Sequence, residues 1–157
     1  MTHRVREMRA AVLFVSIITL SPIGCQEPAG TDDLLRPTFQ VSPETVAPGD
    51  SFAVVFTVRN PTSQTVTISS GAGCLFFLRA LRDSHQVSVQ GLTYFCTAAI
   101  TAFEVPPRGS LNLVRNGVAA ERIGVGVGTP LPPGEYRIQT MMNAALPELQ
   151  AVLTVQD

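Results

Sequence analysis

Alternation of apolar and polar residues over Ser51–Arg59 is the clearest pattern in the chain. One face of this stretch is formed by Phe52, Val54, Phe56 and Val58. The other face is also fairly apolar as far as Thr57, so the period of two predicts a central β-strand. A second run of β-branched residues, Thr65–Ser69, follows Asn60-Pro61. We therefore expect the two runs to form a β-hairpin around Asn60-Pro61, with later strands added to the same sheets.

The rest of the chain shows short apolar runs separated by Pro- and Gly-containing turns. Further strands are predicted at 38–41, 74–81, 86–89, 103–105, 111–114, 135–142 and 149–155. Residues 91–99 have no readable period, and 119–127 is expected to be an edge or an irregular connection. No segment has the length and period of an amphipathic helix. About eight to ten strands without helices predict an all-β, antiparallel β-sandwich of the immunoglobulin-like (Ig-like) type.

Composition supports a folded body and argues against two classes of protein. Hydrophobic residues make up 45% and charged residues 15% of the 157 residues, which is the opposite of the balance in disordered chains. The formal net charge is −1, and the chain contains no lysine. Nucleic-acid binding needs a concentrated cationic surface. We therefore expect no nucleic-acid partner.

The first 24 residues have the pattern of an export signal. Arg4, Arg6 and Arg9 precede an apolar run, Ala10–Leu20. A bilayer core about 30 Å thick needs about 20 residues in a helix, so this run is too short to span it. Its length is that of the apolar region of a signal peptide. We expect residues 1–24 to be removed.

The residues after this run resemble the lipobox of bacterial lipoproteins. A small residue, Gly24, directly precedes Cys25, although Pro22 stands where the lipobox usually has an aliphatic residue. The resemblance implies cleavage before Cys25, acylation of this cysteine and anchoring to a bilayer. A simple secretory signal with Cys25 as an ordinary thiol is the alternative. Gln26, in a position where inner-membrane lipoproteins often carry Asp, favours the outer membrane.

The chain then divides into a tether and one domain. Residues 25–37 contain Pro, Gly and acidic residues without a period, and they read as a flexible linker. The twelve residues after Cys25 reach roughly 20 Å. The domain is predicted to span 38–157 and to be a monomer. The expected location is the cell envelope, with the domain close to the bilayer.

Two cysteines remain in the domain once Cys25 is assigned to lipid. In an exported protein Cys74 and Cys96 predict a disulfide, with two buried thiols as the alternative. The bridge would fix the poorly patterned segment between them. The only histidine after the signal segment is His85, and no CxxC or HxxxH spacing occurs, so no metal or cofactor is expected.

Two short motifs contain residues typical of catalytic or phosphate sites. Asp83-Ser84-His85 has the residue types of a catalytic triad, but adjacent side chains diverge and cannot converge in triad geometry. The run 124–128, GVGVG, has no following Lys-Ser/Thr and no helix, so it is not a phosphate loop. It is interpreted as an irregular strand or an open sheet edge. We expect the protein not to be an enzyme.

Several motifs resemble those of the intracellular proteinase inhibitor (BsuPI-like) family and its Ig-like relatives. These motifs are Phe52–Asn60, Thr65–Ser69, Gly73–Phe77, Val105–Ser110 and Pro133–Tyr136, the last of which also resembles the tyrosine corner of Greek-key sandwiches. The resemblance covers about residues 40–155. It implies an Ig-like sandwich and, as one option, proteinase inhibition. The export signal, the two domain cysteines and the absence of Trp depart from the family.

Two functions remain open. The first is a non-catalytic binding domain that presents loops or a strand edge to an envelope protein or ligand. The second is a proteinase inhibitor that inserts Arg79–Ser88 or Tyr94–Thr97 into a protease, with Arg82 as a possible specificity residue. Candidate binding residues are Arg79, Arg82, His85, Tyr94 and Phe95. We expect the two aromatic residues to belong to the core, with exposure in a binding loop as the alternative.

Overall fold

The computed structural model describes residues 34–93, 95–122 and 128–157, which form an all-β domain. Its strands are β1 (Arg36–Ser42), β2 (Thr45–Val46), β3 (Ser51–Arg59), β4 (Val66–Ser70), β5 (Phe76–Arg82), β6 (His85–Val87), β7 (Val89–Gln90), β8 (Thr101–Val105), β9 (Ser110–Glu121), β10 (Gly134–Met142) and β11 (Gln150–Val155). Each predicted strand has a counterpart, but β9 continues to Glu121, so the expectation that 119–121 begins an edge or irregular connection is wrong, and the strand predicted at 86–89 is divided between β6 and β7. The additional strand is the two-residue β2.

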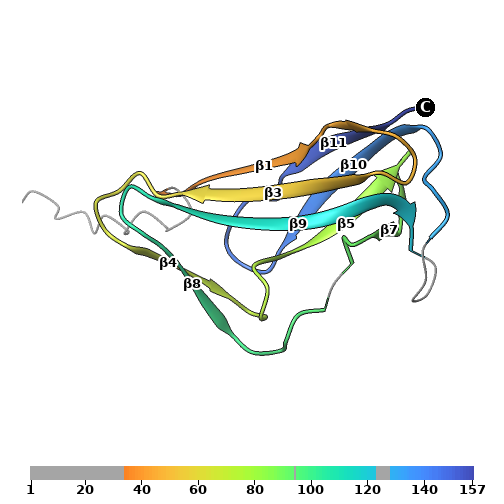
Figure 1. Ribbon diagram of the computed structural model, residues 1–157. Coiled ribbons are helices and arrows are strands. Elements are labelled where there is room, and N and C mark those ends of the chain that lie inside the picture. Colours follow the sequence, from red (N-terminus) through yellow and green to blue (C-terminus); the bar gives the residue numbers. More distant parts are fainter. Residues whose placement is uncertain (1–33, 94, 123–127) are drawn as a thin grey trace, which may run out of the picture.

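The strands form two facing layers and a separate ribbon (Figure 1). One sheet has the order β1-β3-β9-β7, and the other has the order β2-β11-β10-β5-β6. Strands β4 and β8 pair only with each other and diverge from the first sheet. Every pairing between named strands is antiparallel except that of β2 with β11. The predicted antiparallel Ig-like β-sandwich is confirmed.

The predicted hairpin between 51–59 and 65–69 is wrong. Strand β3 pairs with β1 and β9, whereas β4 pairs with β8. The chain turns back at a bend that begins at Asn60, and the β8–β9 connection turns back beside it, but β4 does not pair with β3. The ribbon β4–β8 therefore folds back at an angle to the paired strands β3 and β9 (Figure 1).

The side chain of Asn60 holds this bend. It is fully buried, and its Nδ2 donates to the carbonyl oxygens of Gln64 (2.7 Å), Val105 (3.0 Å) and Pro106 (3.1 Å). Its Oδ1 accepts from the backbone N and the hydroxyl of Thr62, at 2.9 and 2.7 Å. Both connections of the bend are therefore joined through one buried amide group, whose own donor and acceptor atoms are all paired.

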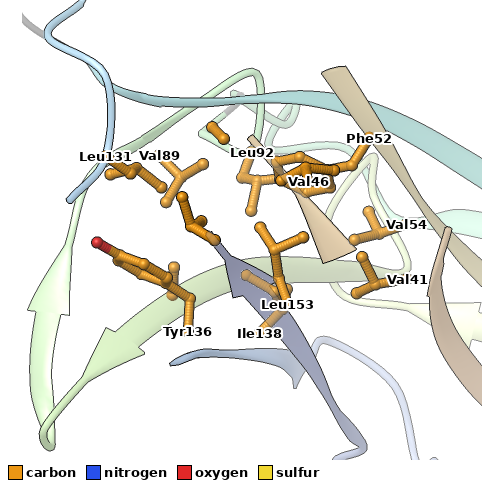
Figure 2. Close-up of a cluster of buried hydrophobic side chains, with 13 residues drawn as sticks. Val41, Val46, Phe52, Val54, Val89, Leu92, Leu131, Tyr136, Ile138 and Leu153 are labelled. Atoms are coloured by element: carbon orange, nitrogen blue, oxygen red, sulfur yellow. The ribbon is translucent and has the colours of Figure 1, made fainter. Parts of the chain in front are cut away.

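Two groups of apolar side chains fill the interior. The first lies between the two sheets and includes Phe52, Val54, Tyr136, Ile138 and Leu153, which point toward one another in Figure 2. The second fills the space beneath the ribbon. It includes Phe56, Val58, Val66, Ile68, Phe76 and Val105. The ribbon is thus part of the folded body, because its inward residues bury apolar surface against β3 and β5.

The tyrosine-corner prediction is confirmed at Tyr136. Its ring is 1% exposed, and its hydroxyl donates to the carbonyl oxygen of Pro132 at 2.7 Å. The hydroxyl also accepts from Nη1 of Arg82 at 3.2 Å. The corner therefore fixes the start of β10 against β5.

The domain begins earlier than the predicted position 38. Strand β1 begins at Arg36, and Leu35 is 4% exposed in the second apolar group. The tether prediction was too long because an isolated Leu-Leu pair gives no period to read. Residues 1–24, Cys25 and most of the glycine-rich run 124–128 lie outside the described residues.

Candidate binding loop

The connection between β7 and β8 exposes two large apolar side chains. Phe95 is 90% exposed and Ile100 is 81% exposed. The expectation that Phe95 belongs to the core is therefore wrong, and Tyr94 lies outside the described residues. Single exposed apolar residues are common on protein surfaces, but two such side chains in one short loop make a candidate contact surface. We call residues 95–100 the binding loop.

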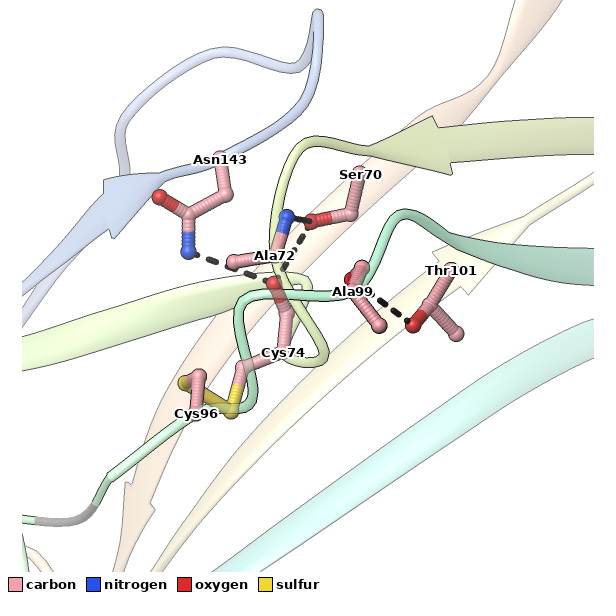
Figure 3. The surroundings of a disulfide bond; sticks show 7 residues. All are labelled: Ser70, Ala72, Cys74, Cys96, Ala99, Thr101 and Asn143. Carbon is pink, nitrogen blue, oxygen red and sulfur yellow. Dashed lines mark hydrogen bonds between the residues drawn. A yellow bond between two sulfur atoms is a disulfide. The ribbon is translucent and has the colours of Figure 1, made fainter.

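A disulfide attaches the binding loop to the rest of the domain, as predicted. Cys74 and Cys96 are bonded, with their Cα atoms 5.4 Å apart (Figure 3). Beside the bridge, the backbone N of Gly73 donates to the carbonyl oxygen of Thr97 at 2.8 Å. A Cβ at position 73 would collide with the Thr97 side chain, so only glycine allows this approach. The loop is held both covalently and by a backbone hydrogen bond.

The other partner in the disulfide is itself fixed to two strands. The carbonyl oxygen of Cys74 accepts from Oγ of Ser70 at 2.7 Å and from Nδ2 of Asn143 at 3.2 Å (Figure 3). Ser70 ends β4 and is 1% exposed, while Asn143 directly follows β10. The backbone N of Asn143 also donates to the carbonyl oxygen of Leu75 at 3.0 Å. The binding loop therefore rests on a support that is connected to both the ribbon and the second sheet.

Among the described residues, a small hollow lies near this support. It is about 60 Å³ in volume and is lined by Gly73, Cys74, Leu75, Phe76, Phe103, Leu113 and Arg115. A second hollow, of about 170 Å³, lies over the second sheet between residues that include Asp83, Ser84 and Arg137. Both are smaller than the roughly 300 Å³ at which small-molecule pockets begin. The binding loop fits a contact with a macromolecule better than enclosure of a small ligand.

The predicted residues Arg79, Arg82 and His85 lie on β5 and β6, away from the binding loop in the chain. Nε of Arg79 donates to Oε1 of Gln139 at 2.8 Å. Arg82 donates to the Tyr136 hydroxyl and, at 3.0 Å, to the Pro133 carbonyl oxygen. These contacts give both arginines a structural role in the second sheet. Arg82 is thus poorly placed to act as a specificity residue.

His85 is exposed at the start of β6, directly after the Asp83-Ser84 turn. Both turn residues have positive φ values, 47° and 67°, as in tight hairpin turns. The Asp83-Ser84-His85 motif is therefore a hairpin connection, and its three side chains occupy successive backbone positions.

Ile100 was missed by the sequence analysis. It follows Ala98-Ala99 just before a strand, and such a run looks the same whether its last residue faces inward or outward. The supporting residues Ser70 and Asn143 were missed as well, since their role depends on chain segments that are distant in sequence. In a stretch without hydrophobic periodicity, the sequence does not indicate which loop side chains are exposed.

Within residues 34–93, 95–122 and 128–157, no group of three or more His, Cys, Asp or Glu side chains is placed to hold a metal ion. Over the same residues, no helix has the length and apolar character needed to cross a membrane.

Comparison with known proteins adds distant structural likenesses only. No protein-family model and no curated protein matches the chain. A β-glucosidase from Erythrobacter marinus matches 78% of the chain at 12% identity and a TM-score of 0.47, and the match covers 15% of that enzyme. The alkylpurine DNA glycosylase AlkC of Pseudomonas fluorescens matches 79% of the chain at 11% identity and a TM-score of 0.41, over 31% of its own length.

A CARDB domain from Pyrococcus furiosus, solved in complex with di-metal ions, is similar over nearly its whole length. It matches 78% of the chain and 94% of its own at 17% identity, with a TM-score of 0.38. All three TM-scores are below 0.5, so the assignment of the fold rests on the strand order and register described above.

Proposed function

We propose that this protein is a lipid-anchored, envelope-facing lipoprotein whose Ig-like domain binds a protein partner through the binding loop and is not itself catalytic. The observation that carries the proposal is the pair of exposed side chains, Phe95 and Ile100, on a loop fixed by Cys74–Cys96. Anchoring is proposed from the signal-like residues 1–24 and from Cys25. Two buried acyl chains are enough for stable attachment.

The physical case for a protein partner is the cost of leaving these side chains in water. Burying a large apolar side chain contributes about 1.5–3 kcal/mol, and aromatic residues are frequent among the dominant contacts of interfaces. A loop that is already fixed loses little conformational entropy on binding. The disulfide and the Gly73–Thr97 hydrogen bond provide this fixation.

Proteinase inhibition is the second candidate, and the same loop favours it. A loop that is exposed and covalently held can occupy a protease cleft without adopting many conformations. Phe95, and not Arg82, would then enter the specificity pocket, because Arg82 is bonded to Pro133 and Tyr136. This reading predicts inhibition of proteases whose pocket accepts an aromatic side chain.

The binding loop is tested by capture from envelope extract. The full-length chain is compared with a variant carrying Phe95→Ser and Ile100→Ser, and with Val152→Ser, which removes a side chain that is 46% exposed on β11. We expect a partner that is captured by the wild type and the Val152 variant, binds again when purified, and binds at least tenfold more weakly to the double variant. Equal affinity for the double variant would refute the role of the loop.

Inhibition assays on a panel of serine proteases distinguish a proteinase inhibitor from a binding domain that does not inhibit. Inhibition at a 1:1 ratio that disappears with Phe95→Ser supports the inhibitor, while binding without inhibition supports the interaction domain. The anchor is tested separately by Cys25→Ser, which we expect to release the protein from the membrane fraction. Full retention of that variant would contradict acylation at Cys25.

A further inference from the structure

Three exposed arginines gather at one end of the sandwich. Arg36 at the start of β1 is the register partner of Arg59 at the end of β3, so both lie on the same face of the sheet. Arg59 is in turn the partner of Ser110, and Arg108 precedes that residue in the β8–β9 connection. We call Arg36, Arg59 and Arg108 the arginine end. None of the three forms an ion pair within the described residues.

The chain segments that carry the three arginines contain no acidic residue; the acidic residue nearest to Arg108 in the sequence is Glu104 on β8, and Glu148 lies between β10 and β11. The segments 36–38, 58–66 and 105–111 contain no Asp or Glu. Residues 34–157 as a whole carry eight arginines and eight acidic residues, so the remainder of the domain has an excess of three negative charges. The domain therefore has a cationic end although its formal charge balances.

Most of the acidic residues lie at the opposite end. They occupy the far ends of the strands and the connections there: Glu44, Asp50, Asp83, Glu121, Glu135 and Asp157. Strand β3 runs from that end to Arg59, a distance of about 27 Å at the usual rise per residue. This is several times the screening length of about 8 Å at physiological salt, so the two ends act as separate charged surfaces.

The tether leaves the domain at the arginine end. Leu35 is buried there and directly precedes Arg36. Ten residue steps separate it from Cys25, which corresponds to a flexible reach of roughly 18 Å. If Cys25 is acylated, the arginine end is therefore the part of the domain nearest to the bilayer surface.

We propose that the arginine end binds the anionic headgroups of the bilayer in which Cys25 is anchored. The proposal rests on the lipid anchor proposed above. Guanidinium groups pair well with phosphate oxygens, and each arginine near an anionic surface strengthens binding about 5-fold. The contact would hold the acidic end away from the membrane and so set the orientation of the domain. The competing partners for the arginines are Glu27, Asp32 and Asp33 of the tether.

The absence of Trp from the chain allows a direct test. The acylated, full-length gene product is purified from membranes with a single reporter, Ser63→Trp, in the exposed corner beside Asn60, and is placed in liposomes with dansyl-labelled lipid headgroups. A second protein carries the reporter at Gln86 on β6, near the acidic end. Energy transfer from Trp to dansyl measures the distance of each end from the lipid surface.

We expect transfer from position 63 to rise when phosphatidylcholine is replaced by a mixture with 30% phosphatidylglycerol, and to fall again in 0.5 M salt. Transfer from position 86 should remain low in every case. The variant Arg36→Gln/Arg59→Gln should lose most of the rise, because the two arginines together account for about a 25-fold preference. The matched variant Arg122→Gln/Arg137→Gln removes the same charge elsewhere and should behave like the wild type.

Three results would overturn the proposal. A protein that stays with the liposomes but shows no dependence on phosphatidylglycerol refutes the contact while leaving the anchor intact. If energy transfer depends on phosphatidylglycerol only after Asp32→Asn/Asp33→Asn, the arginines bind the acidic residues of the tether instead of the headgroups. A purified protein that does not remain with the liposomes refutes the anchor, and with it the contact.

Discussion

Replacing Asn60 by alanine removes the group that joins the two connections at the bend. The side chain makes five hydrogen bonds, of which the one to the Val105 carbonyl oxygen is fully buried and the others are partly buried. A buried group left without a partner costs about 1–3 kcal/mol, and a bond that water can partly replace costs about 0.5 kcal/mol. We therefore expect Asn60→Ala to lower the free energy of unfolding by about 3 kcal/mol.

Urea denaturation and thermal melting of the purified chain measure this loss. For a domain of this size the melting temperature should fall by about 10 °C. Asn112→Ala is the control, because Asn112 is exposed and its side chain accepts a single hydrogen bond, from the Thr57 hydroxyl. It should change the free energy of unfolding by less than about 0.5 kcal/mol. Equal effects of the two substitutions would refute the argument that the buried amide holds the bend.

Three further substitutions test the support of the binding loop and the corner. Cys74→Ala/Cys96→Ala opens a loop with a sequence separation of 22 and should lower the free energy of unfolding in urea by about 3 kcal/mol relative to the oxidised wild type, while the reduced wild type should match the variant; a variant as stable as the oxidised wild type would contradict this role of the bridge. Gly73→Ala should lower the free energy of unfolding by about 2 kcal/mol. Gly71→Ala is its control and should have little effect, because a Cβ at position 71 would meet open space. Equal losses would contradict the close approach of Gly73 to Thr97. Tyr136→Phe deletes the corner hydrogen bond and should lower the melting temperature by about 4 °C. An unchanged melting temperature would show that the hydroxyl does not stabilise the domain.

The strand pattern could be predicted where side-chain burial follows the period of two. In β3 the buried positions Phe52, Val54, Phe56 and Val58 alternate with less buried ones, as expected. The partner of β4 could not be predicted, because an Asn-Pro sequence between two strands suits a hairpin, in which the two strands pair, and a turn after which each strand pairs elsewhere equally well. The difference lies in hydrogen bonds from Asn60 to Val105 and Pro106, which are 45 and 46 residues away.

The candidate site was predicted in part. The cysteine pair was predicted correctly because the sequence pattern of an export signal, with two cysteines in the domain, favours a disulfide. Phe95 was placed in the core because its identity alone favours burial, and residues 91–99 offered no period to correct that expectation. The sequence did not indicate a bonding partner for Arg82, and only the three-dimensional structure shows that it donates to the Tyr136 hydroxyl.

The disulfide also has a mechanical consequence. The covalent ring from Cys74 to Cys96 includes β5, which belongs to one sheet, and β7, which belongs to the other. A force applied between the start of β1 and the C-terminus would pass across the bridge and leave the ring closed. Full extension of the domain would then be shorter by about 75 Å than that of the reduced protein. Part of each sheet would thus remain held in one compact loop even when the remaining strands have been pulled apart.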